Sequence, residues 1–570
     1  MDDIAACIKD HQYNEAIRKT VVDPEEALAK AILEKIPHPP KNSDALVPLE
    51  EYVGKVKLED VSSCSIGRFL LCCLLSDQEP DTWGEKRSKQ FEDAHDVLDE
   101  FMQSTAPSKT EATHVHARFS KLGKIFPKLG LDEAIATIAT TINETDFTSE
   151  APEALHEIFK PLAEIIREKV FVPAFELFKA HESYPTRFQE LIWYRDREVC
   201  MDDFVVFRDL GRGAFGVVSG ARHRVTGQMV ALKGMNRKLI KGKKVLKMVV
   251  GEFQILKTLG EKPSPFCVSL VYSFMDSTDL YLGLPLCTGG DLMFHLRANA
   301  HGYGLERSRF FAAEILLALE HLHNLGILYR DLKPENVLLD EKGHTKISDM
   351  GLAVLTKRTP RTIGEKLLTG RAGTPGYWPP EMLTKKGYGF DADWWSYGVM
   401  LFEFLSGICC FSETYSGCKD RNEATLQYDI KFPELCGEDP FPEDAKDLIL
   451  QLLERDRTKR LGANPKAVEI LKAHPFFESM DWAQMAGAKV TPPWTPPADS
   501  INAASQEELQ GRSKEHEFKK LKLTEEDDVK GINYSSKNHE RDMVTVLRLE
   551  RKGKLSHLEP SVTSGACNIL

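Results

Sequence analysis

The stretch Tyr329–Asn336, which reads Tyr-Arg-Asp-Leu-Lys-Pro-Glu-Asn, constrains this chain more than any other feature. A loop that transfers a phosphoryl group needs an Asp where the substrate hydroxyl arrives, a Lys beside the moving phosphate and an Asn that holds a metal ion. Asp331, Lys333 and Asn336 supply these groups at the required spacing. We therefore expect a fold that brings a nucleotide, a metal ion and a hydroxyl-bearing substrate to this loop.

A glycine-rich motif and a lysine-bearing strand precede this loop, and an acidic motif follows it. Gly211–Val218 reads Gly-Arg-Gly-Ala-Phe-Gly-Val-Val, Val230–Lys233 reads Val-Ala-Leu-Lys, and Asp349 begins Asp-Met-Gly. A Gly-x-Gly-x-x-Gly loop also occurs in dinucleotide-binding folds, where it runs directly into a helix and an acidic residue follows roughly twenty positions on. Here residues 217–221 have the character of a second strand, and Lys233 follows instead of an acid. The order therefore favours ATP over a dinucleotide.

Each charged group of the predicted active site has a defined task. Lys233 is expected to contact the α- and β-phosphates and to pair with Glu252 from a helix over residues 245–259. The alternative for Glu252, a solvated acid on a surface helix, fits less well with the apolar residues that follow it. Asp331 is expected to orient the substrate hydroxyl and accept its proton, and Lys333 to neutralise charge on the transferred phosphoryl group.

Two oxygen donors, Asn336 and Asp349, form the predicted metal site. A hard cation prefers oxygen ligands, and we expect these two side chains to hold Mg²⁺ against the phosphates of ATP.

The adenine base is expected to lie among apolar side chains near the connection between the two lobes. Val218, Ala231 and Leu339 could sandwich a flat base, although core packing alone would explain them equally well. Pro285 has no N–H and could offer only its carbonyl to the adenine amino group, whereas Cys287 could offer its N–H to a ring nitrogen. The complete predicted ATP-binding set is Leu210, Gly211, Arg212, Gly213, Ala214, Phe215, Gly216, Val217, Val218, Ala231, Lys233, Glu252, Pro285, Cys287 and Leu339.

The length and composition of the chain limit the fold classes and functions that it can have. A chain of 570 residues is too long for one core, so two or three domains are expected. The net charge of −12 argues against general nucleic-acid binding. The sequence lacks both a run of eighteen apolar residues and a basic, apolar leader at its N-terminus. The twelve cysteines are scattered without a Cys-x-x-Cys pair, which favours reduced thiols over zinc or disulfides.

The spacing of apolar side chains divides the rest of the chain into regions of different secondary structure. Residues 51–200 show apolar side chains at helical spacing and no polar cluster with catalytic spacing, which indicates a helical bundle used for binding. Within this bundle, the spacing of apolar residues over 104–145 predicts one helix inside a longer insertion. From Phe204 onward, a sheet-rich lobe followed by a larger helical lobe is an α+β pattern. The acidic run at 524–528 is expected to be solvated, and residues 542–555 to form a helix that carries four bases.

The complete motif set resembles a eukaryotic protein kinase over residues 204–477. The closing His-Pro-Phe-Phe at 474–477 resembles the AGC group, and Lys333 with Thr374 fits serine/threonine specificity. Within that group the chain resembles the G protein-coupled receptor kinases, because Tyr329 replaces the usual His and residues 347–353 read Ile-Ser-Asp-Met-Gly-Leu-Ala. By this resemblance Glu381 is expected to pair with Arg460.

The resemblance implies an α+β kinase fold inserted into an all-α regulator-of-G-protein-signalling homology bundle. The expected domains are a receptor-engaging arm at 1–50, the helical domain at 51–200, the kinase at 204–477, an AGC extension at 478–540 and a membrane-targeting tail at 541–570. Gly370 occupies the place of the activating phosphothreonine of many AGC kinases. A glycine cannot be phosphorylated, so activation is expected to come from docking rather than from a phosphate that pairs with Arg330, with Thr369 beside it as the alternative acceptor.

The C-terminus, Cys567-Asn568-Ile569-Leu570, fits a prenylation motif with Cys567 as acceptor and Leu570 favouring geranylgeranyl. A chance cysteine at this position is the alternative, because Asn568 is not aliphatic. One lipid binds a membrane only marginally, and the basic stretch 548–554 is expected to supply a second signal. In the G protein-coupled receptor kinases, which this chain resembles, a prenylated C-terminus is typical of the visual, rhodopsin-kinase-like members. The expected location is the cytoplasmic face of a membrane, with part of the protein in the cytosol.

The function implied by these features is ATP-dependent serine/threonine phosphorylation of activated G protein-coupled receptors, with opsins among the candidates, which promotes receptor desensitisation. Two alternatives stay open at this stage. One is a membrane scaffold whose helical domain binds G protein subunits, and the other is an AGC kinase with soluble substrates.

Overall fold

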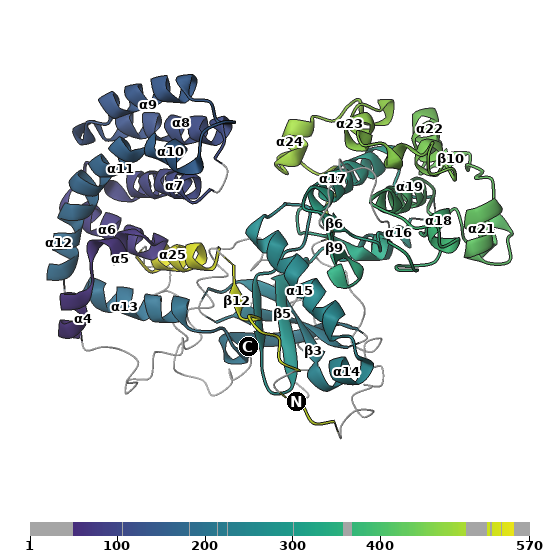
Figure 1. Cartoon of the computed structure of the whole chain (residues 1–570), viewed down its shortest axis with the longest axis horizontal. Helices are drawn as coiled ribbons and strands as arrows, with labels where there is room; N and C mark the ends of the chain where they lie inside the picture. Colours follow the sequence, from purple (N-terminus) through teal and green to yellow (C-terminus); the bar gives the residue numbers. More distant parts are fainter. Residues whose placement is uncertain are drawn as a thin grey trace. The chain divides into compact units, whose positions relative to one another are not determined.

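The computed structural model describes residues 49–104, 107–181, 183–213, 215–224, 226–299, 301–356, 368–497, 521–524, 527–536 and 538–551. These residues form two compact units, which we call the helical unit (49–197 with 538–551) and the two-lobed unit (198–536) (Figure 1). The predictions for the N-terminal arm, for Ala214 and for Cys567 lie outside the described residues. Among the helices that the structure describes, none has the length and apolar character needed to cross a bilayer.

The helical unit is organised around α6 (Ser65–Gln78), which buries eleven of its residues. Gly67 allows this packing, because a Cβ on it would lie 1.8 Å from the Val61 carbonyl oxygen of the preceding helix. The other helices of the unit are α4 (Leu49–Lys55), α5 (Leu58–Ser62), α7 (Gly84–Met102), α8 (Lys109–Ile125), α9 (Asp132–Glu144), α10 (Pro152–Glu157), α11 (Lys160–Ile166), α12 (Val172–Ala180), α13 (Ser183–Asp196) and α25 (Asn538–Arg551).

Residues 104–145 contain two helices rather than the one that the sequence predicted. The missed helix is α8, which begins with a capping box in which Ser108 and Glu111 satisfy each other's backbone N–H groups. It buries Ala112, Val115, Phe119 and Leu122 at helical spacing, and it packs between α7 and α9. Because α8 is mostly polar, its narrow apolar stripe was hard to detect in the sequence. The packing of α8 makes the predicted insertion a regular part of the bundle.

Helix α25 follows the two-lobed unit in sequence but completes the helical unit, where it lies beside α6 (Figure 1). The Glu540 carboxylate accepts hydrogen bonds from Ser65 N at 2.5 Å and Ile66 N at 3.3 Å. Arg548 pairs with Glu92, and Arg551 lies 2.6 Å from Asp77.

One expectation for the C-terminal region therefore needs correction. A domain boundary at 541 would cut through α25, which belongs to the helical unit from Asn538 onward. Two bases of the stretch 548–554, Arg548 and Arg551, are paired with carboxylates of the helical unit, and membrane binding by this stretch stays a prediction.

The small lobe contains a six-stranded antiparallel sheet in the order β1-β2-β3-β5-β4-β12. The last strand comes from beyond the large lobe and extends the edge of the sheet at β4. The elements of this lobe are β1 (Phe204–Arg212), β2 (Gly216–His223), β3 (Met229–Asn236), α14 (Arg237–Lys243), α15 (Leu246–Glu261), β4 (Tyr272–Met275), β5 (Asp279–Pro285) and β12 (Tyr534–Ser535).

The large lobe is mainly helical, and all sixteen residues of its central helix α19 (Asp391–Ser406) are buried. The predicted pair is present, because Glu381 accepts two hydrogen bonds from Arg460, at 2.7 and 2.9 Å, with both side chains almost fully buried. The other elements are α16 (Leu292–Leu296), α17 (Leu305–Asn324), β6 (Ile327–Leu328), β7 (Val337–Leu339), β8 (Thr345–Ile347), β9 (Val354–Leu355), α18 (Pro380–Leu383), α20 (Glu413–Ser416), α21 (Arg421–Gln427), β10 (Leu435–Cys436), β11 (Asp439–Pro440), α22 (Glu443–Leu452), α23 (Ala467–Lys472) and α24 (Trp482–Ala486).

The sequence suggested that the acidic run near the end of the two-lobed unit is simply solvated. The structure instead pairs two of its acids with bases. Asp527 lies 2.7 Å from Lys241 Nζ, and Asp528 pairs with Arg237. Both bases belong to α14, so this part of the tail is attached to the small lobe by charge.

Candidate active site

The catalytic loop is held in place by Asp393, a buried carboxylate near the start of α19. It accepts hydrogen bonds from Tyr329 N at 2.9 Å, Arg330 N at 2.7 Å and His323 Nε2 at 2.8 Å. Arg330 has a φ of 73°, so its left-handed backbone depends on these bonds. Sequence reasoning used Asp393 only as a landmark. The signal that could have revealed its role is a carboxylate directly before two tryptophans in a helix whose residues are mostly apolar.

The side chain of Tyr329 fixes the loop to the following strand. Its hydroxyl donates to the Ser348 carbonyl oxygen at 2.5 Å, immediately before Asp349. Burial raises the pKa of Tyr329 well above its usual range, so this hydroxyl keeps its proton. The tyrosine that distinguished the loop in the sequence therefore connects the catalytic loop to the predicted metal ligand.

Asp331, Lys333, Asn336 and Thr374 form one hydrogen-bonded network. Lys333 Nζ donates to Thr374 Oγ1 at 2.8 Å, and Thr374 Oγ1 donates to Asp331 Oδ1 at 2.7 Å. Asn336 Nδ2 donates to Asp331 Oδ2 at 2.9 Å and to its carbonyl oxygen at 2.8 Å. Thr374, which the predicted site omitted, thus bridges the predicted acceptor of the proton and the predicted phosphate ligand.

Lys233, on β3, reaches the helix α15. Its Nζ lies 2.6 Å from Glu252 Oε1 and 3.6 Å from Asp349 Oδ1, so the predicted pairing with Glu252 is present. Burial would lower the pKa of Lys233, but the two carboxylates outweigh burial and raise it. The lysine is therefore held as a cation beside the site where phosphates are expected.

Asn336 and Asp349 fit a divalent metal, provided that further ligands come from a nucleotide. The Asp349 side chain is 55% exposed, and its backbone adopts φ 48°, which turns the residue away from regular strand geometry. Across the described residues, no cluster of three or more Asp, Glu, His or Cys side chains could hold a metal unaided. A hard cation that keeps one or two protein oxygens and binds phosphates matches this sparse donor set.

The glycines of the β1–β2 loop separate into two kinds. A Cβ on Gly216 would lie 1.8 Å from the Gly234 carbonyl oxygen, so the sheet itself requires that glycine. A Cβ on Gly211 would meet no atom within 4 Å, and one on Gly213 would meet only Gly216 O at 3.9 Å. Protein packing does not require these two glycines, and their missing side chains leave the backbone open to a phosphate.

The predicted adenine site lies where the strands of the small lobe meet the large lobe. Val218 lies opposite Lys233 in the β2–β3 pairing, and Ala231 opposite Leu284 in the β3–β5 pairing, while Leu339 is fully buried on β7. The Pro285 carbonyl accepts a weak hydrogen bond from the Cys287 thiol at 3.9 Å. Burial raises the pKa of Cys287 to about 12, so the thiol is neutral and is not a nucleophile.

The remaining predicted nucleotide contacts belong to the same loop and its two strands. Leu210 and Arg212 lie on β1, and Arg212 is 3.6 Å from Asp209. Val217 pairs with Gly234 on β3. Phe215 packs against Lys243, whose Nζ lies 5.0 Å from the ring centroid. These contacts position the loop, while direct nucleotide binding by these four residues stays a prediction.

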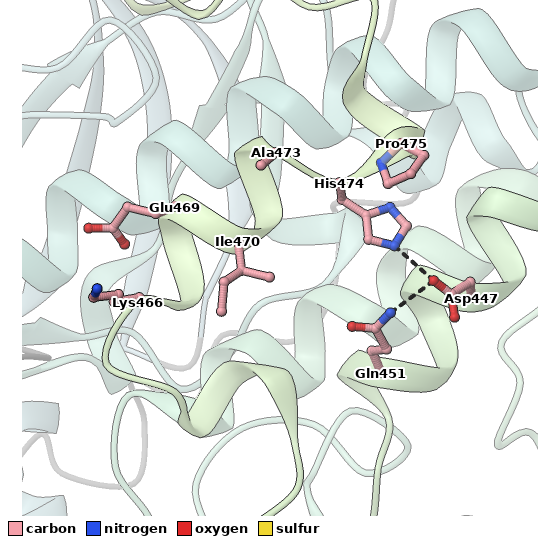
Figure 2. A pocket seen from close by; sticks show the side chains of 8 residues that line it. All are labelled: Asp447, Gln451, Lys466, Glu469, Ile470, Ala473, His474 and Pro475. Carbon is pink, nitrogen blue, oxygen red and sulfur yellow. Dashed lines mark hydrogen bonds and ion pairs between the residues drawn. The ribbon is translucent and has the colours of Figure 1, made fainter.

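A hollow of about 520 Å³ lies elsewhere on the large lobe, between α22 and α23 (Figure 2). His474 and Gln451 both point to the Asp447 carboxylate there, at 3.1 and 2.8 Å. None of its lining residues is a predicted site residue, and the Asp447 carboxylate there is already bonded to His474 and Gln451. The geometry of Asp331 and Lys233, rather than this hollow, therefore identifies the active site.

The arginine of the catalytic loop is satisfied without a phosphate. Arg330 Nε donates to the Leu352 carbonyl oxygen at 2.7 Å, and Nη1 donates to the Tyr388 hydroxyl at 3.3 Å. Gly370, at φ 98°, has open space where a side chain would begin. Leu352 and Tyr388 thus supply Arg330 with neutral oxygen acceptors.

Together these groups can move a phosphoryl group from ATP to a hydroxyl. Asp331 is oriented by Thr374 and Asn336 and can accept the hydroxyl proton, while Lys333 and Lys233 place positive charge where phosphate charge develops. ATP supplies the phosphoryl group, and a divalent metal at Asn336 and Asp349 would neutralise its charge.

Comparison with known proteins supports this assignment. Residues 204–477 match the protein kinase domain family. Human beta-adrenergic receptor kinase 1 is 32% identical over 549 residues, which cover 92% of this chain and 73% of the relative. G protein-coupled receptor kinase 2 of Caenorhabditis elegans is 36% identical over 383 residues, covering 66% of this chain and 51% of the relative. The chain is therefore a serine/threonine protein kinase that uses ATP and a divalent metal, and it belongs to the G protein-coupled receptor kinase family.

Proposed function

We propose that this kinase phosphorylates serine and threonine side chains of activated G protein-coupled receptors, with Mg²⁺ as its metal. The observation that carries the proposal is the match over 92% of the chain to a kinase named for the beta-adrenergic receptor. The neutral partners of Arg330 agree with it, because a kinase that needs no activating phosphate must be switched on by something else. A receptor that binds only in its activated state would supply that signal.

The test compares phosphate incorporation from labelled ATP into one receptor in its agonist-bound and antagonist-bound forms. The wild-type kinase is expected to label the agonist-bound receptor faster, and Asp331→Ala is expected to label neither form. A soluble acidic protein serves as the reference substrate. Equal labelling of both receptor forms, or labelling of the soluble protein alone, would favour a kinase with soluble substrates.

We further propose that the protein is a peripheral protein of the cytoplasmic membrane face, held there by a prenyl group on Cys567. The support is the C-terminal tetrapeptide, since the bases Arg548 and Arg551 are paired within the helical unit. The second membrane signal must then come from the bound receptor or from bases after residue 551. A visual subfamily and opsin substrates are finer proposals that rest on the same tetrapeptide, and receptor desensitisation is a finer proposal that rests on membership of the family.

Removal of the acceptor cysteine tests the membrane proposal. In cells that prenylate proteins, Cys567→Ser is expected to move the kinase from the membrane fraction to the soluble fraction. Leu570→Ser is the matched control, because it keeps the cysteine and favours farnesyl over geranylgeranyl. The control should remain membrane-bound and should differ in intact mass. An unmodified Cys567 in the wild-type protein would rule the proposal out.

A further inference from the structure

A tryptophan in the proline-rich segment after the large lobe covers a buried cation. Trp494 is half-buried, and its ring centroid lies 3.6 Å from Cζ of Arg307 on α17. Arg307 Nε and Nη2 are buried and have no hydrogen-bond partner among the described residues. Because burial disfavours the charged form, the pKa of Arg307 is lowered to about 10. The faces of Trp494 and Tyr303, whose ring centroid lies 4.5 Å from Cζ, therefore take the place of a carboxylate.

The same ring leads to the connection between the two lobes. Trp494 meets His295 of α16 edge to face, with ring centroids 4.8 Å apart and planes at 70°. His295 is buried, and its Nε2 donates a hydrogen bond of 2.6 Å to the Gly289 carbonyl oxygen. Gly289 lies two positions after Cys287, a predicted adenine contact. One imidazole therefore connects the tail tryptophan to the backbone that follows Cys287.

Gly289 is in turn joined to β7, the strand of Leu339. Gly289 N donates to the Leu339 carbonyl oxygen at 3.0 Å, and Leu339 N donates to the Gly290 carbonyl oxygen at 2.8 Å. A Cβ on Gly289 would lie 2.6 Å from Leu339 Cβ, so there is no room for a side chain between the two segments. A shift of Gly289 would therefore displace two residues that are predicted to contact the base, Cys287 and Leu339.

The tail segment also packs against the turn that joins β7 to β8. A Cβ on Gly343 would lie 2.2 Å from the Trp494 carbonyl oxygen and 3.3 Å from Pro492 Cβ, so only glycine fits there without a shift. Prolines stand at positions 492, 493, 496 and 497, and each fixes its own φ, which stiffens the chain around Trp494. Residues 492–494, which we call the tail brace, therefore contact the β7–β8 turn directly and reach Gly289 through His295.

We propose that Trp494 is a positioning residue for the adenine of ATP. The ring itself does not touch the nucleotide. The tail brace holds Gly289 and β7 in place, so that Leu339 and the Cys287 N–H keep the spacing that a flat base requires. The proposal rests on the kinase activity and on the predicted adenine site, and it does not involve the receptor.

Loss of the ring would act on the base end of the nucleotide alone. Without Trp494 the Arg307 cation still has no acceptor and loses its nearest aromatic face, so the tail brace would leave the large lobe. Gly289 and the β7–β8 turn would then be free to shift. Lys233 and Asp331 belong to other elements and keep their partners, so the transfer step at saturating ATP should be little changed.

The experiment measures the affinity of the full-length protein for adenosine and for ADP by calorimetry. Trp494→Ala is expected to raise the Kd of both ligands by about fivefold, an effect that the loss of one partly desolvated cation–π contact can supply. Equal losses are expected because adenosine carries the base without the phosphates. In a peptide assay the KM for ATP should rise by the same factor, while kcat stays within about twofold of the wild-type value.

Three variants separate this role from a general loss of stability. Trp494→Phe keeps an aromatic face and should restore most of the affinity for adenosine. Trp482→Ala is the matched control, because Trp482 is another half-buried tail tryptophan, and its Nε1 donates to the Lys472 carbonyl oxygen of α23 at 3.0 Å. This control should leave the Kd for adenosine unchanged. His295→Ala should weaken adenosine binding, and adding Trp494→Ala to it should cost less than in the wild-type chain.

Three results would contradict this role of Trp494. The first is an unchanged Kd for adenosine in a folded Trp494→Ala protein. The second is an equal loss of affinity in Trp482→Ala, and the third is a loss for ADP without one for adenosine. None of these measurements uses a receptor, so each of these results would leave the proposed receptor substrates untouched.

Discussion

Replacement of Asp331 with Asn is expected to lower kcat by about 10²–10⁴-fold, the contribution of a positioned general base. Asn keeps an oxygen that can accept the Thr374 hydrogen bond, now 2.7 Å long, but it cannot accept a proton. The measurement is the rate of peptide phosphorylation at saturating ATP. Because Lys233 and Glu252 are untouched, the Kd for ATP should stay within a small factor of the wild-type value.

Glu335→Gln is the matched control for this substitution. Glu335 lies in the same loop but is exposed, and its side chain takes no part in the network around Asp331. Its kcat is expected to remain close to that of the wild-type enzyme. If Asp331→Asn retained a tenth of the activity, Asp331 would not be the base. If Glu335→Gln lost as much activity, the effect would belong to the loop rather than to one carboxylate.

Loss of Arg460 is expected to cause the largest change in stability. Arg460→Met leaves the Glu381 carboxylate buried without a partner, and removal of one member of a buried pair costs about 3–5 kcal/mol. Arg460 also donates to the Glu454 carbonyl oxygen at 2.8 Å and stacks on Trp395, so its loss frees several groups together. The expected result is a melting temperature lower by several degrees, with fast hydrogen exchange in α18.

A neighbouring arginine provides the comparison for Arg460. Arg457 makes two hydrogen bonds to Asp391, at 2.6 and 2.7 Å, but its side chain is 35% exposed. Arg457→Met should therefore lower the melting temperature less, since water can enter the partly exposed space that Arg457 leaves and Arg460 Nη1 still lies 3.5 Å from the buried Asp391 carboxylate. If both variants lowered the melting temperature equally, burial would not explain how much the Arg460–Glu381 pair contributes to stability.

The sequence predicted two charge pairs correctly, because a phosphoryl-transfer site restricts both the type and the spacing of its residues. Lys233 and Glu252 meet at 2.6 Å, and Arg460 and Glu381 meet as the resemblance implied. The supporting contacts were not predictable in the same way. Asp393 is far from Tyr329 in the sequence, and only the fold places its carboxylate against the backbone of the catalytic loop.

Long-range charge pairing accounts for the remaining differences. The acids at 527–528 looked solvated, and the bases at 548 and 551 looked unpaired, because their partners lie in distant segments. A local pattern shows that a charge exists but not what neutralises it. Helix α8 was missed for a related reason, since its few apolar residues become informative only when α7 and α9 cover them.

The place of α25 in the chain has a consequence for synthesis. The α6 helix leaves the ribosome early, but the Glu540 carboxylate that caps its first N–H groups comes only after the whole two-lobed unit. At about 5–20 residues per second the helical unit waits roughly 20 to 70 seconds for its last helix. During that interval the apolar surface that Met543 and Leu547 will cover is available to chaperones. A nascent chain that stops early therefore carries an incomplete helical unit, and its uncovered apolar surface distinguishes it from the finished chain.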